Sequence, residues 1–261
     1  MKAGDTAVHL LGAAAFRILR LRIVGRGTGS LAFGTIWWFA WLAALVVYSN
    51  RAGLLACLSA LILLALFRTS AAWIRLLSAA GLSIATMAIL DLSVTVAPGK
   101  VVSLSSLTER ILSIVDSDTG NVRLDATRQW RLDWWREILN YTFLGPYLLT
   151  GKGYGINLAD ADGFQVTSDK SLRSPHNGHL TVLARSGAPG LATWIVLQMV
   201  LIAQIGRIYR RAVRNGDIRA ADLSLWLTCY WLAFMVNISF DVVLEGPHGG
   251  IWYWSILGMA L

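Results

Sequence analysis

Long apolar segments separated by short polar connections dominate this 261-residue chain. The segment Leu31–Ser49 contains no charged residue, and only Asn50 and Arg51 separate it from the apolar run Ala52–Phe67. Each run is close to, or slightly shorter than, the roughly 20 residues that cross a bilayer as a helix. Three further runs of this length are Trp73–Leu90, Leu191–Ile205 and Leu223–Phe240. Because a soluble core of this size could not bury five such helices, the pattern predicts an all-α polytopic membrane protein, a transmembrane helix bundle.

The two ends of the chain depart from this pattern. Gly249–Leu261 is apolar but too short to span a bilayer, so we expect the chain to be truncated at its C-terminus. Ala7–Val24 is apolar but carries Arg17, Arg20 and Arg22, which is typical of an amphipathic helix lying on a membrane surface. We therefore expect residues 1–30 to form a basic amphipathic segment on the cytoplasmic face.

A polar insertion separates the two groups of spans. We expect three transmembrane helices over 31–90, an extramembrane loop domain over 91–189, and further transmembrane helices with a basic loop over 190–261. The insertion from Asp91 to Pro189 holds ten basic and ten acidic residues, so the net charge of +8 comes from the rest of the chain. The basic residues there lie in alternate connections, which marks those connections as cytoplasmic. The insertion, the turn at Ser49–Arg51 and the short loop Asp241–His248 are the opposite connections and therefore face outward.

Composition supports this interpretation and limits the alternatives. Hydrophobic residues make up 56% and charged residues 15% of the chain, whereas soluble domains contain about 25% charged residues. The positive charge follows membrane topology, and no basic patch with interleaved aromatic residues indicates a nucleic-acid partner. Cys57 and Cys229 both lie within apolar runs, where cysteine usually packs as a small hydrophobic residue.

The insertion contains a strongly amphipathic helix over Thr127–Phe143. A weaker helical pattern covers Leu104–Val115, and the polar stretch Asp116–Leu124 predicts a loop between the two. An aromatic face on a helix beside a membrane is typical of a helix lying in the interface plane. That face consists of Trp130, Trp134, Ile138 and Tyr141.

Several arginines could bind an anion. Arg51, in the short outer turn, is either an arginine that extends to the membrane surface or an anion clamp, because a guanidinium can bind phosphate oxygens in bidentate fashion. Arg128 and Arg131 lie in the amphipathic helix and could either solvate it or bind a ligand. Arg136 has acidic neighbours, so we expect it to pair with Asp133 or Glu137 along the helix.

The end of the insertion carries candidate chemistry. His176 lies at the predicted membrane surface, and imidazole titrates near neutral pH, so it is a candidate proton-transfer group. His176 and His179 lack further ligands at zinc-site spacing, which argues against a metal. The turn Gly151–Gly155 is either a flexible connection or a set of backbone N–H groups that binds an anion.

Four segments together resemble one family. His176-Asn177, nine further residues and then Gly187-Ala188-Pro189-Gly190 give H-N-x9-G-x-x-G, which is similar to the signature of the bacterial O-antigen ligase family. The resemblance covers roughly Gly34 to Leu261. The other matching segments are S-N-R at Ser49–Arg51, R-L-D-W-W-R at Arg131–Arg136 and G-K-G-Y-G at Gly151–Gly155.

The resemblance implies a glycosyltransferase of the bacterial inner membrane with a periplasmic loop. It implies transfer of a glycan from undecaprenyl diphosphate to an acceptor hydroxyl on a glycan or lipid, with no cofactor and no metal. It assigns His176 as the base. It assigns Arg51, Arg131 and Arg128 to diphosphate binding, and Asn177, Gly187, Gly190 and Trp135 to supporting roles.

Two alternatives remain open. A repeat-unit polysaccharide polymerase of the same superfamily would share these features, because the pattern does not select the acceptor. A polysaccharide transporter or flippase would instead carry ionisable residues or broken helices within its spans. The predicted spans carry almost no charge, and the polar residues gather in one outer insertion, which favours an enzyme.

Overall fold

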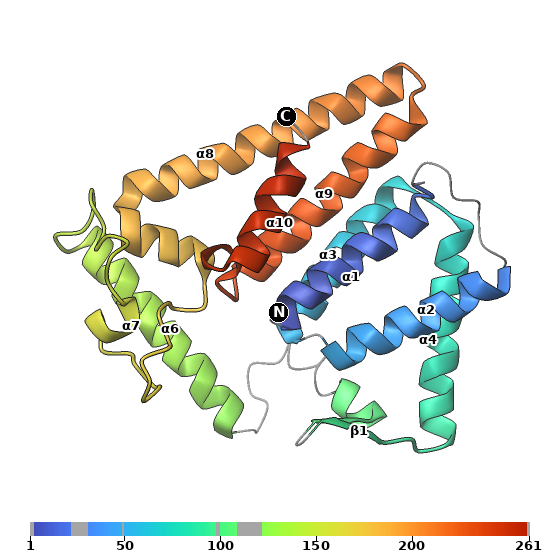
Figure 1. Ribbon diagram of the computed structural model, residues 1–261, viewed down its shortest axis with the longest axis horizontal. Coiled ribbons are helices and arrows are strands. Elements are labelled where there is room, and N and C mark those ends of the chain that lie inside the picture. The colour runs from blue at the N-terminus through green and yellow to red at the C-terminus, as the bar shows by residue number, and fades with distance from the viewer. Residues whose placement is uncertain (1–2, 22–30, 49, 98–99, 109–121, 260–261) are drawn as a thin grey trace. The chain divides into compact units, whose positions relative to one another are not determined.

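The computed structural model describes residues 3–21, 31–48, 50–97, 100–108 and 122–259. Its regular structure is predominantly helical (Figure 1), which confirms the predicted all-α class. The chain forms two compact units. The first contains Met1–Asp116 and Gly206–Phe234, and the second contains Ser117–Ile205 and Met235–Leu261.

Three apolar helices of the first unit lie close to their predicted limits. They are α2 (Leu31–Tyr48), α3 (Arg51–Phe67) and α4 (Ala71–Ile89). α3 begins after Asn50 because the Asn50 side chain accepts a hydrogen bond from the backbone N–H of Gly53 at 2.8 Å, which satisfies one of the free donors of the first turn. The polar residues between the first two apolar runs therefore act as a helix cap.

Helix α1 (Ala3–Ile18) is an internal helix of the first unit. It packs closely on α3, since a Cβ added at Gly53 would lie 2.6 Å from the Cβ of Ala7. Close contact is possible because glycine has no side chain and that of alanine is small, and the basic residue of α1, Arg17, lies in the last turn. The position of residues 1–30 on the cytoplasmic face stays a prediction.

Helix α9 (Ile218–Ile238) joins the first unit through its residues up to Phe234. Arg68, which follows α3, donates from Nε to Oδ1 of Asp222 at 2.7 Å. Cys57 and Cys229 are both buried and free, and the Cys229 thiol lies 3.7 Å from a backbone carbonyl of α3. Both cysteines therefore serve as small packing residues.

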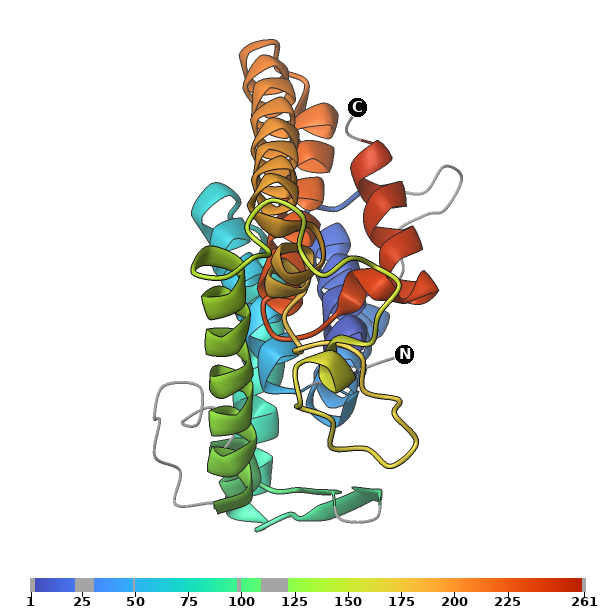
Figure 2. The ribbon, with the colours of Figure 1, turned by 90° about the vertical axis from the view of Figure 1, so that its left-hand side faces the viewer.

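A two-stranded antiparallel sheet follows α4 (Figure 2). It consists of β1 (Val94–Ala97) and β2 (Lys100–Val102), which are too short to give a clear alternating pattern in the sequence. Helical structure begins at residue 104, as expected for Leu104–Val115. The rest of that segment and the first part of the loop predicted over Asp116–Leu124 lie outside the described residues. The last three residues of that predicted loop, Val122–Leu124, are instead helical and begin a helix that continues to Phe143.

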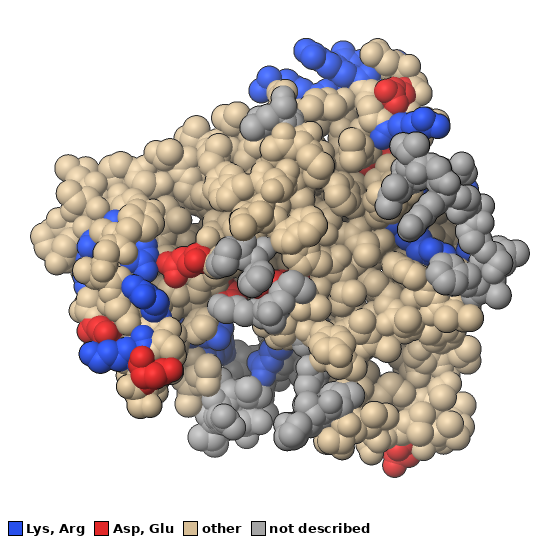
Figure 3. Space-filling model, in the orientation of Figure 1, with Lys and Arg blue, Asp and Glu red and all other residues tan. Residues whose placement is uncertain are grey.

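Three helices within the described ranges are long and apolar enough to cross a membrane: α4, α8 (Gly178–Arg214) and α9. Residues Gly34–Tyr48 of α2 and all of α3 are apolar but shorter. Only 11% of the apolar window of α4 and 22% of that of α8 are buried inside the protein, so lipid is the natural cover for both. The chain is therefore a multi-pass membrane protein. Figure 3 shows basic side chains gathered over the connection between α8 and α9, where the basic loop was predicted.

The second unit is built around α6 (Val122–Phe143). Trp130 and Tyr141 are partly buried against its core. The aromatic face of α6 therefore packs against protein, whereas the sequence pattern had led us to expect that it faces the membrane interface. The buried core comprises Trp134 and Ile138 of α6, Leu158 and Ala159 of α7 (Leu158–Ala161), and Leu183 and Ala184 of α8.

Helix α8 is interrupted at Gly187, whose backbone angles of φ 65° and ψ −167° are not helical. The short part before Gly187 runs at a sharp angle to the long apolar part after it (Figure 1). Pro189 lies in the first turn after the interruption, where its missing N–H costs little. The second unit also contains the short 3-10 helix η1 (Val243–Glu245) and α10 (Pro247–Gly258).

Candidate functional site

His176 occupies a constrained turn directly before α8. Its φ of 52° lies in the left-handed region, which is uncommon for residues other than glycine but is visited more often by asparagine, aspartate and histidine. The carbonyl of Pro175 accepts a hydrogen bond from the Trp135 indole N–H at 2.8 Å, so α6 fixes the approach to the turn. A strained backbone held by its neighbours is typical of functional sites.

Asn177 begins the helix that follows His176. Its side-chain oxygen accepts a hydrogen bond from the Leu180 N–H at 3.1 Å, and its carbonyl accepts from the Thr181 hydroxyl at 2.8 Å. Asn177 is therefore the N-cap of α8. Its predicted supporting role has a specific structural basis, because this cap holds the turn that carries the histidine.

Asp241 is the acidic partner of His176. The Nδ1 atom of His176 lies 3.4 Å from Oδ1 of Asp241, and the same oxygen accepts a hydrogen bond from the Val242 N–H at 2.7 Å. Asp241 is buried, whereas His176 is only partly buried. When Nδ1 carries the hydrogen that faces Asp241, the second ring nitrogen, Nε2, keeps its lone pair and can accept a proton.

Arg131 of α6 supplies positive charge beside this pair. Its Nε atom is buried and has no hydrogen-bond partner. Burial lowers the pKa of the guanidinium from its ordinary value, and the charge of Asp241 partly opposes that shift. An N–H group left unpaired inside a protein costs free energy unless an acceptor reaches it, so this arginine can bind an anionic ligand favourably. The R-L-D-W-W-R segment thus contributes Arg131 as a cation and Trp135 as an anchor for the turn.

The other two predicted diphosphate ligands are Arg128 and Arg51. Arg128 is exposed on α6, one turn before Arg131. Arg51 is half-buried at the first residue of α3 and belongs to the first unit. A cavity of about 970 Å³ in that unit is lined by residues such as Arg68 and Trp73, which lie at the opposite end of α3. Arg51 therefore does not line this cavity. Arg136 lies 3.5 Å from Asp133, as predicted.

Gly187 and Gly190 allow two backbone segments to cross. A Cβ added at Gly187 would lie 2.5 Å from the carbonyl oxygen of Leu148, and one at Gly151 would lie 2.3 Å from the backbone of Arg185. At Gly190, an added Cβ would overlap the Ser186 side chain. The glycines of the signature are therefore needed for close packing between the glycine turn and the interruption of α8.

The glycine turn Gly151–Gly155 uses its backbone donors within the protein. The Lys152 N–H donates to the carbonyl of Ala184 at 2.7 Å, and the Gly153 N–H donates to the carbonyl of Arg185 at 3.0 Å. These bonds satisfy two carbonyls at the end of the short helix before Gly187. The two donors are thus engaged, which argues against the alternative that the turn cradles an anion.

A buried ion pair beneath the turn escaped the sequence analysis. Lys152 Nζ lies 2.6 Å from Oδ1 of Asp162, and the other carboxylate oxygen accepts from the Trp134 indole at 2.6 Å. The Lys152 ammonium also lies 3.9 Å from the centre of the Tyr141 ring. Burial and the nearby Asp162 charge raise the pKa of the Tyr141 phenol. In the sequence, only the lysine within G-K-G-Y-G could have indicated this ion pair.

Arg185 ties the same turn to the segment after α9. It is buried, and its Nε donates to Glu245 at 3.1 Å. Its Nη1 lies within 3.3 Å of the carbonyls of Gly153, Tyr154 and Ile156. Sequence reasoning also missed Asp241, although the charge pattern had placed the loop that begins there on the same side as the insertion.

His179 is held by a structural hydrogen bond. Its Nδ1 accepts from the Trp194 indole N–H at 3.0 Å. This nitrogen is therefore engaged within the protein. Of the two histidines, only His176 combines partial exposure with a carboxylate partner.

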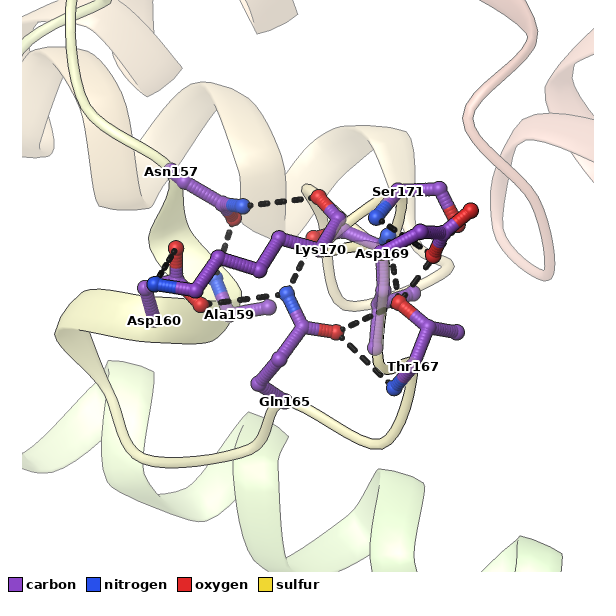
Figure 4. Close-up of polar contacts among 9 residues, drawn as sticks. Asn157, Ala159, Asp160, Gln165, Thr167, Asp169, Lys170 and Ser171 are labelled. Atoms are coloured by element: carbon purple, nitrogen blue, oxygen red, sulfur yellow. Dashed lines mark hydrogen bonds and ion pairs between the residues drawn. The ribbon is translucent and has the colours of Figure 1, made fainter.

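The polar loop that leads to His176 is organised by its own side chains (Figure 4). The Gln165 amide donates to Asp160 at 3.1 Å and to the carbonyl of Leu172 at 3.0 Å. The Ser171 hydrogen bonds lower the pKa of the Asp169 carboxyl. This network orders the chain between α7 and the His176 turn. Within the described residues, no three histidine, cysteine, aspartate or glutamate side chains gather as a metal site would require.

The fold and the site together define a multi-pass membrane protein in which His176 of the polar insertion pairs with Asp241, which follows α9, beside the partly buried Arg131. Residues 34–195 match the family described as O-Antigen ligase, and the chain belongs to that family. No curated protein matches the chain. The family makes it a membrane glycosyltransferase of the O-antigen ligase and polymerase type, with a lipid-linked glycan and an acceptor as its substrates.

Proposed function

We propose that the protein transfers a glycan from undecaprenyl diphosphate to an acceptor hydroxyl at the periplasmic side of the bacterial inner membrane. The observation that carries the proposal is the pairing of His176 with Asp241 beside Arg131, which has a buried N–H without an acceptor. The arrangement offers a proton acceptor and a cation for a leaving diphosphate.

In the proposed reaction, the acceptor oxygen attacks the anomeric carbon of the donor glycan. The bond between that carbon and the diphosphate oxygen breaks, and the diphosphate leaves with the bonding electrons. The acceptor proton passes to Nε2 of His176, while Asp241 holds the ring through Nδ1 and stabilises the resulting imidazolium. Arg131 binds the diphosphate oxygens, and Arg51 and Arg128 contribute to the same diphosphate.

The test is a transfer assay with the full chain in proteoliposomes and an undecaprenyl-diphosphate-linked glycan as donor. We expect release of undecaprenyl diphosphate that depends on both His176 and an added acceptor. Product analysis then identifies the acceptor, since a ligase extends a lipid acceptor once, whereas a polymerase gives a ladder of longer glycans. Movement of intact donor across the bilayer without release of the diphosphate would instead indicate a transporter.

The periplasmic position of the insertion has its own test. A cysteine at the exposed position Ser168 should react with a membrane-impermeant thiol reagent in intact spheroplasts. Labelling that requires lysis would reverse the proposed topology and with it the proposed reaction.

A further inference from the structure

We propose that the turn Phe143–Leu149, between α6 and the glycine turn, is inserted into the outer leaflet of the lipid bilayer and anchors the extramembrane site to the membrane surface. The turn exposes large apolar side chains: Leu144 is 86% exposed, Leu149 is 71% exposed and Phe143 is 50% exposed. The segment FLGPYLL contains no charged residue. An apolar patch this exposed needs a cover other than water.

The position of the turn relative to a membrane span identifies that cover. The Ala188 N–H donates to the carbonyl of Leu148 at 2.7 Å. The apolar run of α8 starts at Leu191, about one helical turn further on. Ala188 therefore lies at the level where the span leaves the hydrocarbon, and Leu148 is hydrogen-bonded to it at the same depth. Exposed side chains such as Ile195 and Val196 continue the apolar surface along the span.

The backbone of the turn is suited to the edge of a bilayer. The Leu144 N–H donates to the carbonyl of Asn140 at 2.8 Å, and the Gly151 N–H donates to the carbonyl of Tyr147 at 3.0 Å. Backbone groups paired in this way can enter an apolar environment without a large desolvation cost. Tyr147 also packs against Tyr141, with ring centres 5.6 Å apart, and aromatic rings are favoured at membrane interfaces.

The nearby charge does not oppose insertion. Lys152, which follows the turn, is paired with Asp162, and only 13% of its side chain is exposed. An unpaired ammonium at this depth would be costly, whereas the paired one presents little charge to lipid. The turn joins α6, which carries Arg131, to the interruption of α8. Anchoring it therefore fixes both helices at the membrane surface, independently of which reaction the site performs.

The test uses nitroxide labels on the full chain in proteoliposomes of phosphatidylethanolamine and phosphatidylglycerol. Cys57 and Cys229 are replaced by alanine, and single cysteines are introduced at Leu144, Leu149 or, as the control, Ser168. Electron paramagnetic resonance then compares collisions of each label with oxygen, which partitions into lipid, and with a water-soluble nickel complex. We expect the labels at 144 and 149 to favour oxygen and the label at 168 to favour nickel.

Two outcomes would overturn the proposal. Labels at 144 and 149 that favour nickel, as at 168, would place the turn in water. Labels shielded from both reagents would show that protein covers the turn, and dipolar broadening between labels would identify a second copy of this chain as the cover. A matched pair adds a further check: Leu144→Asp should lower the oxygen preference of a label at 149. Val166→Asp, at an exposed site in the polar loop, should leave it unchanged.

Discussion

The Nδ1 atom of His176 lies 3.4 Å from Oδ1 of Asp241, although 65 positions separate the two residues in the sequence. The histidine precedes α8 and the aspartate follows α9. The pair therefore joins the segment just before the start of α8 to the segment just after the end of α9. The contact turns Nδ1 of the ring toward Asp241 and gives the imidazole a defined orientation.

Replacing Asp241 by asparagine should reduce glycan transfer strongly. Asparagine keeps an oxygen that can accept the Val242 N–H, so the turn should persist, but it cannot stabilise a protonated imidazole. We expect a loss on the order of 10²-fold in kcat, measured by diphosphate release. Asp169→Asn, at an exposed carboxylate in the polar loop, is the control and should retain normal activity. Equal effects of the two changes would mean that the charge of Asp241 has no special role.

The role of His176 is best tested with asparagine rather than alanine. Asparagine tolerates the left-handed backbone conformation found at φ 52° and so preserves the turn while removing the imidazole. We expect His176→Asn to lower transfer by on the order of 10²–10⁴-fold with little change in thermal unfolding. His179→Asn should show the reverse, a lower unfolding temperature with smaller loss of activity, because the bond to Trp194 is lost. Normal transfer by His176→Asn would make the residue structural.

Alanine substitutions at three glycines test how closely the backbone of the glycine turn approaches the interruption of α8. Gly155→Ala should be close to neutral, because nothing lies within 4 Å of the added Cβ. Gly153→Ala meets no neighbour but has a φ of 85°, so we expect a cost of about 1–2 kcal/mol. Gly187→Ala adds a backbone clash to the same strain, which gives about 2–5 kcal/mol. The free energy of unfolding, measured in detergent, gives the order of the three variants. Equal losses of stability at 153 and 187 would contradict the close backbone approach at Gly187.

The limits of the helices were predictable because apolar runs and helix caps are local signals. α2, α3 and α4 follow the predicted segments closely, and α6 ends at Phe143 as predicted but begins at Val122, five residues earlier than predicted. The packing of α1 and of the aromatic face of α6 was not predictable, because an amphipathic pattern does not say whether lipid or protein covers the apolar side. The site shows the same division. Motifs located His176 and Arg131, whereas Asp241 and Arg185 act through contacts between distant segments that periodicity does not encode.

Arg131→Lys should make activity sensitive to pH. Burial lowers the pKa of the cation at this position, and arginine remains charged because its ordinary pKa is so high. Lysine starts from about 10.4, so the same burial brings its pKa toward the assay range. The charged form exists below that pKa, and the activity of the variant relative to wild type should therefore fall as pH rises from about 6 to about 10. For Arg136→Lys, on the surface, the ratio should stay flat.

The proposed reaction requires that Arg51 and Arg131 act on the same diphosphate. If two guanidiniums bind one diphosphate, replacing one of them lets the diphosphate shift away from the other. The effects of the two substitutions on activity are then not independent. We expect Arg51→Lys and Arg131→Lys each to lower kcat/KM for the donor, because an ammonium cannot reproduce the planar bidentate contact. The double variant should then lose less than the product of the two single losses. Pairing Arg51→Lys with Arg136→Lys supplies the control cycle, in which the effects should multiply, since Arg136 lies beside Asp133 on the surface. Strictly multiplicative losses for Arg51 and Arg131 would mean that the two arginines serve separate sites.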